Sequence, residues 1–390
     1  MDWDDPIAAM KLRWSHIQPL LFPFLREEVN PLTEKRERLI VVLDSIGLES
    51  FVRALPAGPG RPRDDRRAIA RGFVAKAVLG LPTTRALVER LQVDGSLRRI
   101  CGWERRAEVP SEATFSRAFG EFANDGLPER MHEALVKRAF GDRIVGVVAR
   151  DATEIEAREK PAKKDDDPPP PAPKKRGRPR KDEPPPAQPS RLERQTTQSL
   201  DQMRAELPQA CDVGTKKNSK GYKESWIGYK LHIDTACGQI PVSLILTSAS
   251  PHDSQVAIPL MTMTSQRITY LYEVMDSAYD AATIDTHSRT LGHTPVIDPN
   301  FRANRELKAE WSAETKRRAF INMPDFDDAI YNFRTMAERV NARLKDEFGA
   351  RFVRVRGAVK VKCHLMFGAL ALTVDQIFHV REFENAPAPA

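Results

Sequence analysis

The chain has 390 residues, of which 41% are hydrophobic and 29% charged, so it is long enough for two or three domains with buried cores. The 61 basic and 54 acidic side chains give a net charge of +7, which is ordinary for a protein that binds nucleic acid. Four scattered cysteines without a C-x-x-C pair exclude a disulfide scaffold and a thiolate zinc site, and the lack of an apolar run of about 18 residues argues against a membrane partner.

The first 140 residues have the apolar spacing of helices. Helices are expected over 68–79 and 85–97, and Ser111 is expected to cap a third helix with three phenylalanines on its buried side. These are Phe115, Phe119 and Phe122. Short helices that end in a capped, arginine-bearing helix suit a helix-turn-helix that reads DNA. A helical bundle without a DNA role fits the same pattern equally well.

A proline-rich segment divides the chain. Residues 161–190 hold 11 of the 30 prolines and no Ile, Leu, Val or aromatic residue. Such a segment cannot offset its ordering entropy by burial, so we expect a disordered linker. It separates a helical N-terminal domain (1–140) and a first strand region (141–160) from the remaining residues, 191–390.

The rest of the chain alternates between strand and helix patterns. Strands are expected over 144–149, 226–235, 240–247, 268–275 and 295–297. Helices are expected over 254–263, where Asp253 is the expected N-cap, and over 280–290, 327–347 and 362–380. This order predicts an α/β fold with a mixed five-stranded sheet and flanking helices.

Two aspartates stand at the ends of apolar strand patterns. Asp151 follows the first strand and Asp276 the fourth. The carboxyl ends of strands usually handle ligands in an open α/β sheet. If these strands are neighbours, the two carboxylates repel each other unless a cation lies between them, and Mg²⁺ suits such oxygen ligands. An aspartate after a strand is also a common turn residue, so neither marks a site by itself.

The helix expected over 327–347 carries four polar residues within a narrow stripe, namely Tyr331, Arg334, Glu338 and Lys345. At about 100° per residue they fall within roughly 60° of one another. A solvated face with i,i+4 pairs is a common alternative. The mixture of one acid with a phenol and two cations instead suits a metal ligand beside groups that hold phosphates.

These four residues form the pattern Y-x2-R-x3-E-x6-K, which resembles the signature of bacterial insertion-sequence transposases of the DDE type, in the branch named for those residues. The blocks 151–153 and 276–280 resemble the family's two aspartate elements, and the stretches 228–232, 250–253 and 109–117 are also typical. The likeness covers roughly residues 60–380. It implies an RNase H-like fold in which Asp151, Asp276 and Glu338 are the catalytic, metal-binding residues. It also implies that Tyr331, Arg334 and Lys345 contact DNA phosphates.

The resemblance implies metal-dependent cleavage at transposon ends and strand transfer into target DNA. Mg²⁺ or Mn²⁺ is the implied cofactor, with two ions expected. The implied partners are double-stranded DNA, as inverted repeats and target, and further copies of this chain in a homo-oligomer of two or more subunits. The expected location is the bacterial cytoplasm, at the nucleoid. Two alternatives remain open: a catalytically inactive DNA-binding relative, such as a repressor or domesticated protein, and a non-mobile nuclease of the same fold.

Two further segments are predicted to contact DNA. Residues 174–181 resemble an AT-hook, whose arginines enter a narrow A·T-rich minor groove. Its core is Arg176, Gly177, Arg178, Pro179 and Arg180. Lys216 and Lys217 lie in a lysine- and glycine-rich stretch that is predicted to follow the DNA backbone. A charged linker and an exposed loop with ordinary lysines are the alternatives.

Overall fold

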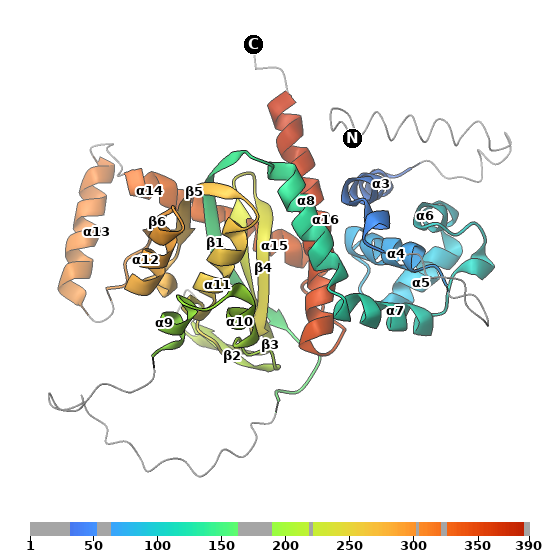
Figure 1. Cartoon of the computed structure of the whole chain (residues 1–390), viewed down its shortest axis with the longest axis horizontal. Helices are drawn as coiled ribbons and strands as arrows, with labels where there is room; N and C mark the ends of the chain where they lie inside the picture. The colour runs from blue at the N-terminus through green and yellow to red at the C-terminus, as the bar shows by residue number, and fades with distance from the viewer. Residues whose placement is uncertain are drawn as a thin grey trace, which may run out of the picture.

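The computed structural model describes residues 32–52, 64–162, 189–217, 221–301, 304–320 and 326–385. The AT-hook-like core, Arg176 to Arg180, lies outside these residues, so that prediction stays as it is. A mixed sheet occupies the centre of the molecule, and the N-terminal helices lie to one side of it (Figure 1).

Within the described residues the sheet has six strands, in the order β2-β3-β1-β5-β6, with β4 also paired to β3. The strands are β1 (Ile144–Glu156), β2 (Asp212–Lys217), β3 (Lys223–Ala236), β4 (Ile240–Ser248), β5 (Thr269–Met275) and β6 (Thr294–Ile297). β1 is antiparallel to β3 and parallel to β5, which is parallel to β6. β3 pairs with β1 along one edge, and along the other edge with β2 and then β4.

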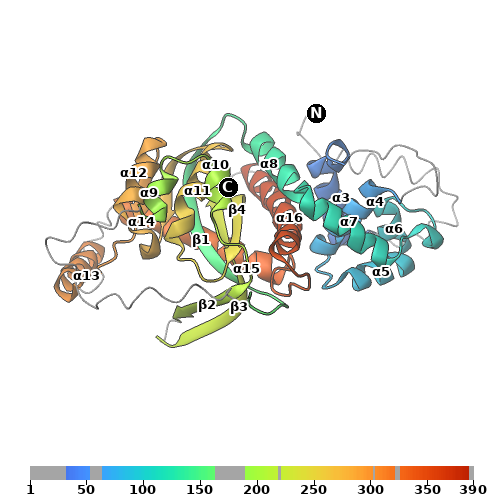
Figure 2. The same ribbon diagram turned by 60° about the horizontal axis from the view of Figure 1, so that its bottom comes forward.

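Two strands differ from their predicted extents. β2 was not predicted because DVGTKK has no apolar run; it pairs only with the first part of β3, and the two form a ribbon that projects from the body (Figure 2). Lys216 and Lys217 therefore lie in a strand rather than a loop. β1 does not stop at Ala149 but continues to Glu156, because this polar stretch pairs with β3. Asp151 consequently lies within β1.

Helices cover both faces of the sheet. On one face, α11 (Ser254–Ser265) packs on β3 and β4, and it is flanked by α9 (Arg191–Gln195), α10 (Leu200–Ala205) and α12 (Ala282–Thr290). On the other face lie α15 (Thr335–Asp346) and α16 (Ala358–Asn385), with α8 (Leu127–Phe140) packed against α16. The apolar residues that alternate along β1, β3 and β4 form separate core clusters with these two layers.

The N-terminal region is helical, as predicted. In its described residues the α-helices are α3 (Glu34–Ile46), α4 (Arg66–Val78), α5 (Thr84–Val93), α6 (Gly95–Cys101) and α7 (Glu112–Asn124), followed by α8. The helix expected over 85–97 is two helices, because the Asp94 side chain accepts the backbone N–H of Leu97 and begins α6 there. Ser111 caps α7 as expected, and the three predicted phenylalanines of α7 are buried against Phe73.

The long helix α16 joins the two parts of the molecule. It runs between the sheet and the N-terminal helices (Figure 2) and contacts α3, α4, α7, α8 and β4. One apolar cluster includes residues from all of these elements. Its segment Ala358–Val380 is long and apolar enough to cross a membrane, but 78% of its most apolar window is buried, as expected of a core helix.

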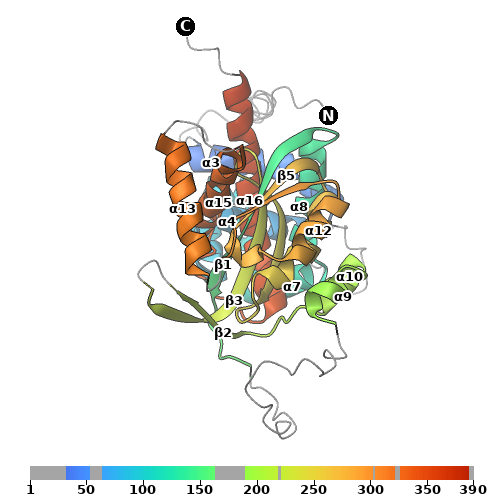
Figure 3. The ribbon, with the colours of Figure 1, turned by 90° about the vertical axis from the view of Figure 1, so that its left-hand side faces the viewer.

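The chain between Asp276 and Glu338 is short and mostly helical. After a turn of 3₁₀ helix, η4 (Ser277–Tyr279), and α12, it forms β6, α13 (Arg305–Phe320), α14 (Phe326–Tyr331) and a second such turn, η5 (Asn332–Arg334). No inserted β-domain is present in the described part of this stretch. α13 stands apart from the body of the molecule (Figure 1), and in Figure 3 it lies on the side that faces the viewer.

Candidate active site

The pairing of β1 with β5 places Asp151 beside Asp276. Each residue of β5 carries a number 125 higher than its β1 partner, as in Ile144 with Thr269 and Ala149 with Val274. The pairing ends at Ala149 and Val274; continued by two residues, the same register sets Asp151 beside Asp276, whose charge acts on Asp151. The Asp276 carboxylate also accepts the backbone N–H of Ala278, at 3.0 Å.

Both carboxyl groups lie in surroundings that disfavour their charge. Burial raises the pKa of Asp151 to about 6, and the negative charge of Asp276 adds to this effect. Burial also raises the pKa of Asp276, and Asp253 and Asp298 raise it further. Two adjacent, partly desolvated carboxylates with raised pKa values form a site that is stabilised by positive charge. Their oxygens are the ligand type that Mg²⁺ and Mn²⁺ prefer.

Two residues of the predicted polar stripe, Tyr331 and Arg334, lie near these aspartates. The helix expected over 327–347 is α14, η5 and α15 in succession, with the turn of 3₁₀ helix at 332–334. The Arg334 guanidinium lies 5.9 Å from the centre of the Tyr331 ring and 2.7 Å from Glu338 Oε1. Its positive charge also lowers the pKa values of Asp151 and Asp276, against the larger effect of burial.

The structure does not bring Glu338 together with the two aspartates as predicted; Arg334, its ion-pair partner, is the link between them. The Glu338 side chain is 49% exposed and is paired with Arg334. Among the described residues, no three His, Cys, Asp or Glu side chains are close enough together to hold a metal ion. One helical turn after Glu338, however, Asn341 donates a hydrogen bond of 2.9 Å to Asp151 Oδ2. The face of α15 that carries Glu338 is therefore the face that meets Asp151.

Lys345 and Lys216 converge on one carboxylate. Lys345 Nζ lies 2.9 Å from Glu154 Oε1, and Lys216 Nζ lies 3.1 Å from Glu154 Oε2. Although burial raises the pKa of Glu154, the hydrogen bonds from these lysines lower it to about 2. The lysines thus reach the end of β1 from α15 and from the β2–β3 ribbon. The side chain of Lys217, the last residue of β2, lies outside the described part of the structure.

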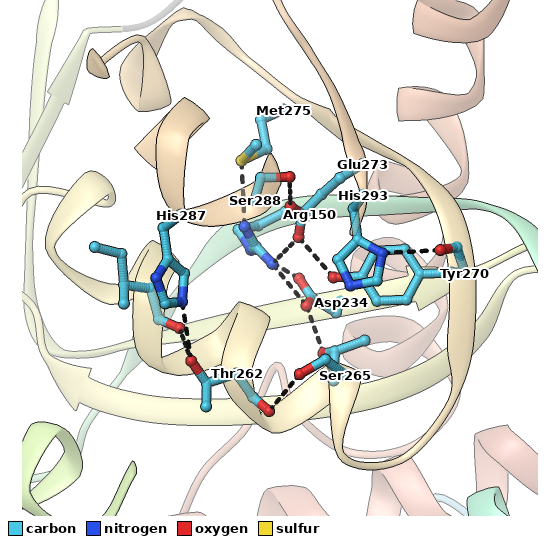
Figure 4. Close-up of polar contacts among 12 residues, drawn as sticks. Arg150, Asp234, Thr262, Ser265, Tyr270, Glu273, Met275, His287, Ser288 and His293 are labelled. Carbon is cyan, nitrogen blue, oxygen red and sulfur yellow. Dashed lines mark hydrogen bonds and ion pairs between the residues drawn. The ribbon is translucent and has the colours of Figure 1, made fainter. Parts of the chain in front are cut away.

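A buried ionic network lies under the site, and the sequence patterns did not reveal it (Figure 4). Arg150 makes two hydrogen bonds of 2.8 Å to Asp234 on β3 and one of 2.7 Å to Glu273 on β5, and all three side chains are fully buried. Thr264 also donates to Asp234, and Ser288 to Glu273. The only sequence signal was a charged residue within each apolar strand pattern. The network ties β1 to both of its neighbours next to Asp151.

Two family models match the chain. The first, described as "Transposase DDE domain", matches residues 146–374, and the second, "Transposase domain (DUF772)", matches residues 24–121. The first covers more than half of the chain. The chain belongs to the transposase DDE domain family. Neither a curated protein nor a solved structure matches it.

Family membership confirms the predicted architecture of this transposase, an RNase H-like α/β domain with a helical region before it. It also establishes the general class of activity, since members of this family act on DNA and use divalent metal ions. The Asp151–Asp276 pair fits such an ion, because both carboxylates are oxygen ligands in need of positive charge. The branch with the Tyr-Arg-Glu-Lys signature stays a prediction.

Three polar residues near the site of the transposase were not identified as site residues from the sequence. Asn341 contacts Asp151 directly, and Asp253 and Asp298 add negative charge near Asp276. Asp253 begins α11 as expected, but its side chain does not cap the helix and instead lies 2.8 Å from Lys230 Nζ. The position of Asn341, three residues after Glu338 on one helix face, is a signal that could have indicated it.

Proposed function

We propose that this transposase cleaves DNA at transposon ends and joins the freed 3′-hydroxyl to target DNA. Asp151, Asp276 and Glu338 are the proposed catalytic residues. The observation that carries the proposal is the parallel pairing of β1 with β5, whose register, continued by two residues, brings Asp151 beside Asp276, in a chain of the DDE family. The face of α15 that carries Glu338 meets the same strand end, through Asn341.

The proposed cofactor is Mg²⁺ or Mn²⁺, in two ions held by Asp151, Asp276 and Glu338. Such ions stabilise the attacking and leaving oxygens of an in-line displacement at phosphorus. Before it can hold an ion, Glu338 must leave its ion pair with Arg334. A DNA phosphate is a competing anion for the Arg334 guanidinium. When Arg334 turns to the phosphate, Glu338 is released toward the aspartates.

Tyr331, Arg334 and Lys345 are the proposed phosphate contacts near the cut. Tyr331 also lines a groove of about 550 Å³ with Trp311, Asp298 and other residues of α12 and β6, which opens beside the site. Lys216 and Lys217 on the β2–β3 ribbon are proposed to extend the contact along the backbone. The AT-hook-like core, Arg176 to Arg180, is proposed to add minor-groove affinity.

The N-terminal helices are proposed to read the transposon ends, as the transposase domain matched over residues 24–121 supports. α16 packs against both these helices and the sheet, so end recognition and the catalytic site share one rigid support. The proposed active assembly is a homo-oligomer on paired ends, in the bacterial cytoplasm at the nucleoid.

A coupled cleavage and strand-transfer assay tests the proposal. Duplexes that carry the inverted repeats flanking the gene are incubated with the protein, Mg²⁺ or Mn²⁺, and a target plasmid. The native protein should nick the end and join it to the plasmid, whereas Asp151→Asn, Asp276→Asn and Glu338→Gln should do neither. Asp346→Asn, a change of the same kind at the exposed end of α15, is the control and should retain activity.

Each failure has its own meaning. Cleavage without joining identifies a nuclease of the same fold. Specific binding of the ends without cleavage identifies an inactive DNA-binding relative. Cleavage that survives Glu338→Gln removes this residue from the proposed catalytic set.

A further inference from the structure

We propose that Asn341 is a positioning residue that holds the Asp151 carboxylate ready for the metal. This inference rests on the proposed function, because it assumes that Asp151 is a metal ligand. Asn341 Nδ2 lies 2.9 Å from Asp151 Oδ2, and Asn341 is only 6% exposed. It comes from α15, which packs on β1, the strand that carries Asp151.

The orientation of the Asn341 amide follows from this contact. An ionised carboxylate can only accept hydrogen bonds, so the amide must present its N–H₂ group to Asp151. The amide oxygen, Oδ1, then points elsewhere, and it is buried without a hydrogen-bond partner in the part of the chain that the structure describes. An unpaired buried oxygen destabilises a fold. An apolar side chain at this position would pack without that cost.

The benefit of Asn341 therefore lies in what it does for Asp151. Its hydrogen bond engages one carboxylate oxygen, fixes the orientation of the group, and leaves the other oxygen available to a cation. Because the amide is neutral, it does so without cancelling the negative charge that attracts the ion, unlike Arg334. Groups that orient a metal ligand in this way tune metal affinity, and removal of such a group lowers the metal affinity roughly 10- to 100-fold.

Mn²⁺ titration followed by electron paramagnetic resonance, combined with thermal unfolding without metal, tests this role. The proteins are the native chain, Asn341→Leu, Asn341→Ala and Asp151→Asn. Gln376→Leu is the control at a second buried amide (7% exposed), which donates to Gly238 O and accepts from Arg343, so that its oxygen is paired, unlike that of Asn341. Asn341→Ala covers the case in which leucine is too large for the site.

We expect both Asn341 variants to bind Mn²⁺ roughly 10- to 100-fold more weakly than the native chain. The melting temperature of Asn341→Leu without metal should change little, because loss of the unpaired oxygen offsets loss of the hydrogen bond to Asp151; Asn341→Ala also leaves a space and should melt lower. Gln376→Leu should show the opposite pattern, with native Mn²⁺ affinity and a lower melting temperature.

The outcomes separate the two proposals. If the native chain and Asp151→Asn bind Mn²⁺ equally, or neither binds it, the assignment of Asp151 as a metal ligand fails. If Asp151→Asn loses Mn²⁺ but both Asn341 variants bind it like the native chain, the positioning role alone fails. It also fails if Asn341→Leu loses stability and affinity together, as Asn341 is then a packing residue.

Discussion

Arg150 and Asp151 are neighbours in the chain but serve opposite faces of the sheet. Arg150 is fully buried in the ionic network with Asp234 and Glu273, on the side of α11 and α12. Asp151 meets Asn341 of α15 on the other side. Because side chains alternate along a strand, a fixed position of one sets the position of the other. The network thus secures the register on which the alignment of Asp151 with Asp276 depends.

Arg150→Lys should destabilise the protein strongly although it preserves the charge. A lysine ammonium cannot make the two-pronged contact with Asp234 and also reach Glu273, so one carboxylate remains buried and poorly compensated. We expect the free energy of unfolding, measured with urea, to fall by about 2–4 kcal/mol. Arg289→Lys, at an exposed pair with Asp285, should change it far less. If the two variants lowered the free energy of unfolding equally, the buried network would contribute no more to stability than the exposed pair does.

Asp151→Asn should stabilise the metal-free protein while it removes activity. The pKa of Asp151 is raised from 3.8 to about 6, so the folded state binds the proton more tightly than the unfolded state. Ionisation of Asp151 therefore lowers the free energy of unfolding of the native chain progressively as pH rises from about 4 to 6, and by the full amount above 6. The variant lacks this penalty, on the order of 2–3 kcal/mol at pH 8 and much less near pH 4.

Urea unfolding in the presence of EDTA at several pH values measures this difference. Asp285→Asn, a neutralised surface aspartate, should gain no stability at high pH. A loss of stability for Asp151→Asn at pH 8 would mean that the ionised carboxylate is held by favourable contacts that outweigh its burial.

Local patterns were enough to predict most of the fold and the aspartate pair. The apolar runs that become β4 and β5 and the phenylalanine face of α7 depend on spacing alone, which a sequence displays directly. The prediction that Asp151 lies near Asp276 required one further assumption, that β1 and β5 are adjacent strands. The structure confirms that these strands are adjacent.

Features that depend on partners distant in the chain could not be predicted in this way. The extension of β1 beyond Ala149 comes from pairing of polar residues with β3, which no hydrophobic pattern reveals. The same holds for Glu154, whose two lysine partners come from separate elements. The polar stripe was visible in the sequence, but its spacing does not tell whether Glu338 pairs with Arg334 or turns to the aspartates.

Glu154→Gln should strengthen DNA binding. In the native chain Lys345 and Lys216 are paired with the Glu154 carboxylate. A DNA phosphate must therefore displace that carboxylate before it can bind the two lysines. The glutamine variant removes that competition, and the affinity for a short random-sequence duplex, followed by fluorescence anisotropy, should rise several-fold. The gain should shrink as salt rises, because it is electrostatic. Glu156→Gln makes the same charge change at an exposed position of β1 and should have a smaller effect. Weaker binding by Glu154→Gln would indicate that Glu154 holds the lysines in place for DNA.

Arg334→Gln should separate metal binding from DNA cleavage. Removal of the guanidinium frees Glu338 and takes a positive charge away from Asp151 and Asp276, so Mn²⁺ should bind several-fold more tightly in the absence of DNA. Cleavage should nevertheless fall roughly tenfold or more, because the proposed phosphate contact is lost.

Mn²⁺ titration and the cleavage assay on the same preparation measure both effects of Arg334→Gln, and Arg339→Gln serves as the control because this neighbour is exposed on the same helix. If Mn²⁺ affinity does not rise in Arg334→Gln, the ion pair is not what keeps Glu338 from the aspartates. The glutamate would then need a movement of α15 itself to reach the metal, and the affinity would increase only once DNA is bound.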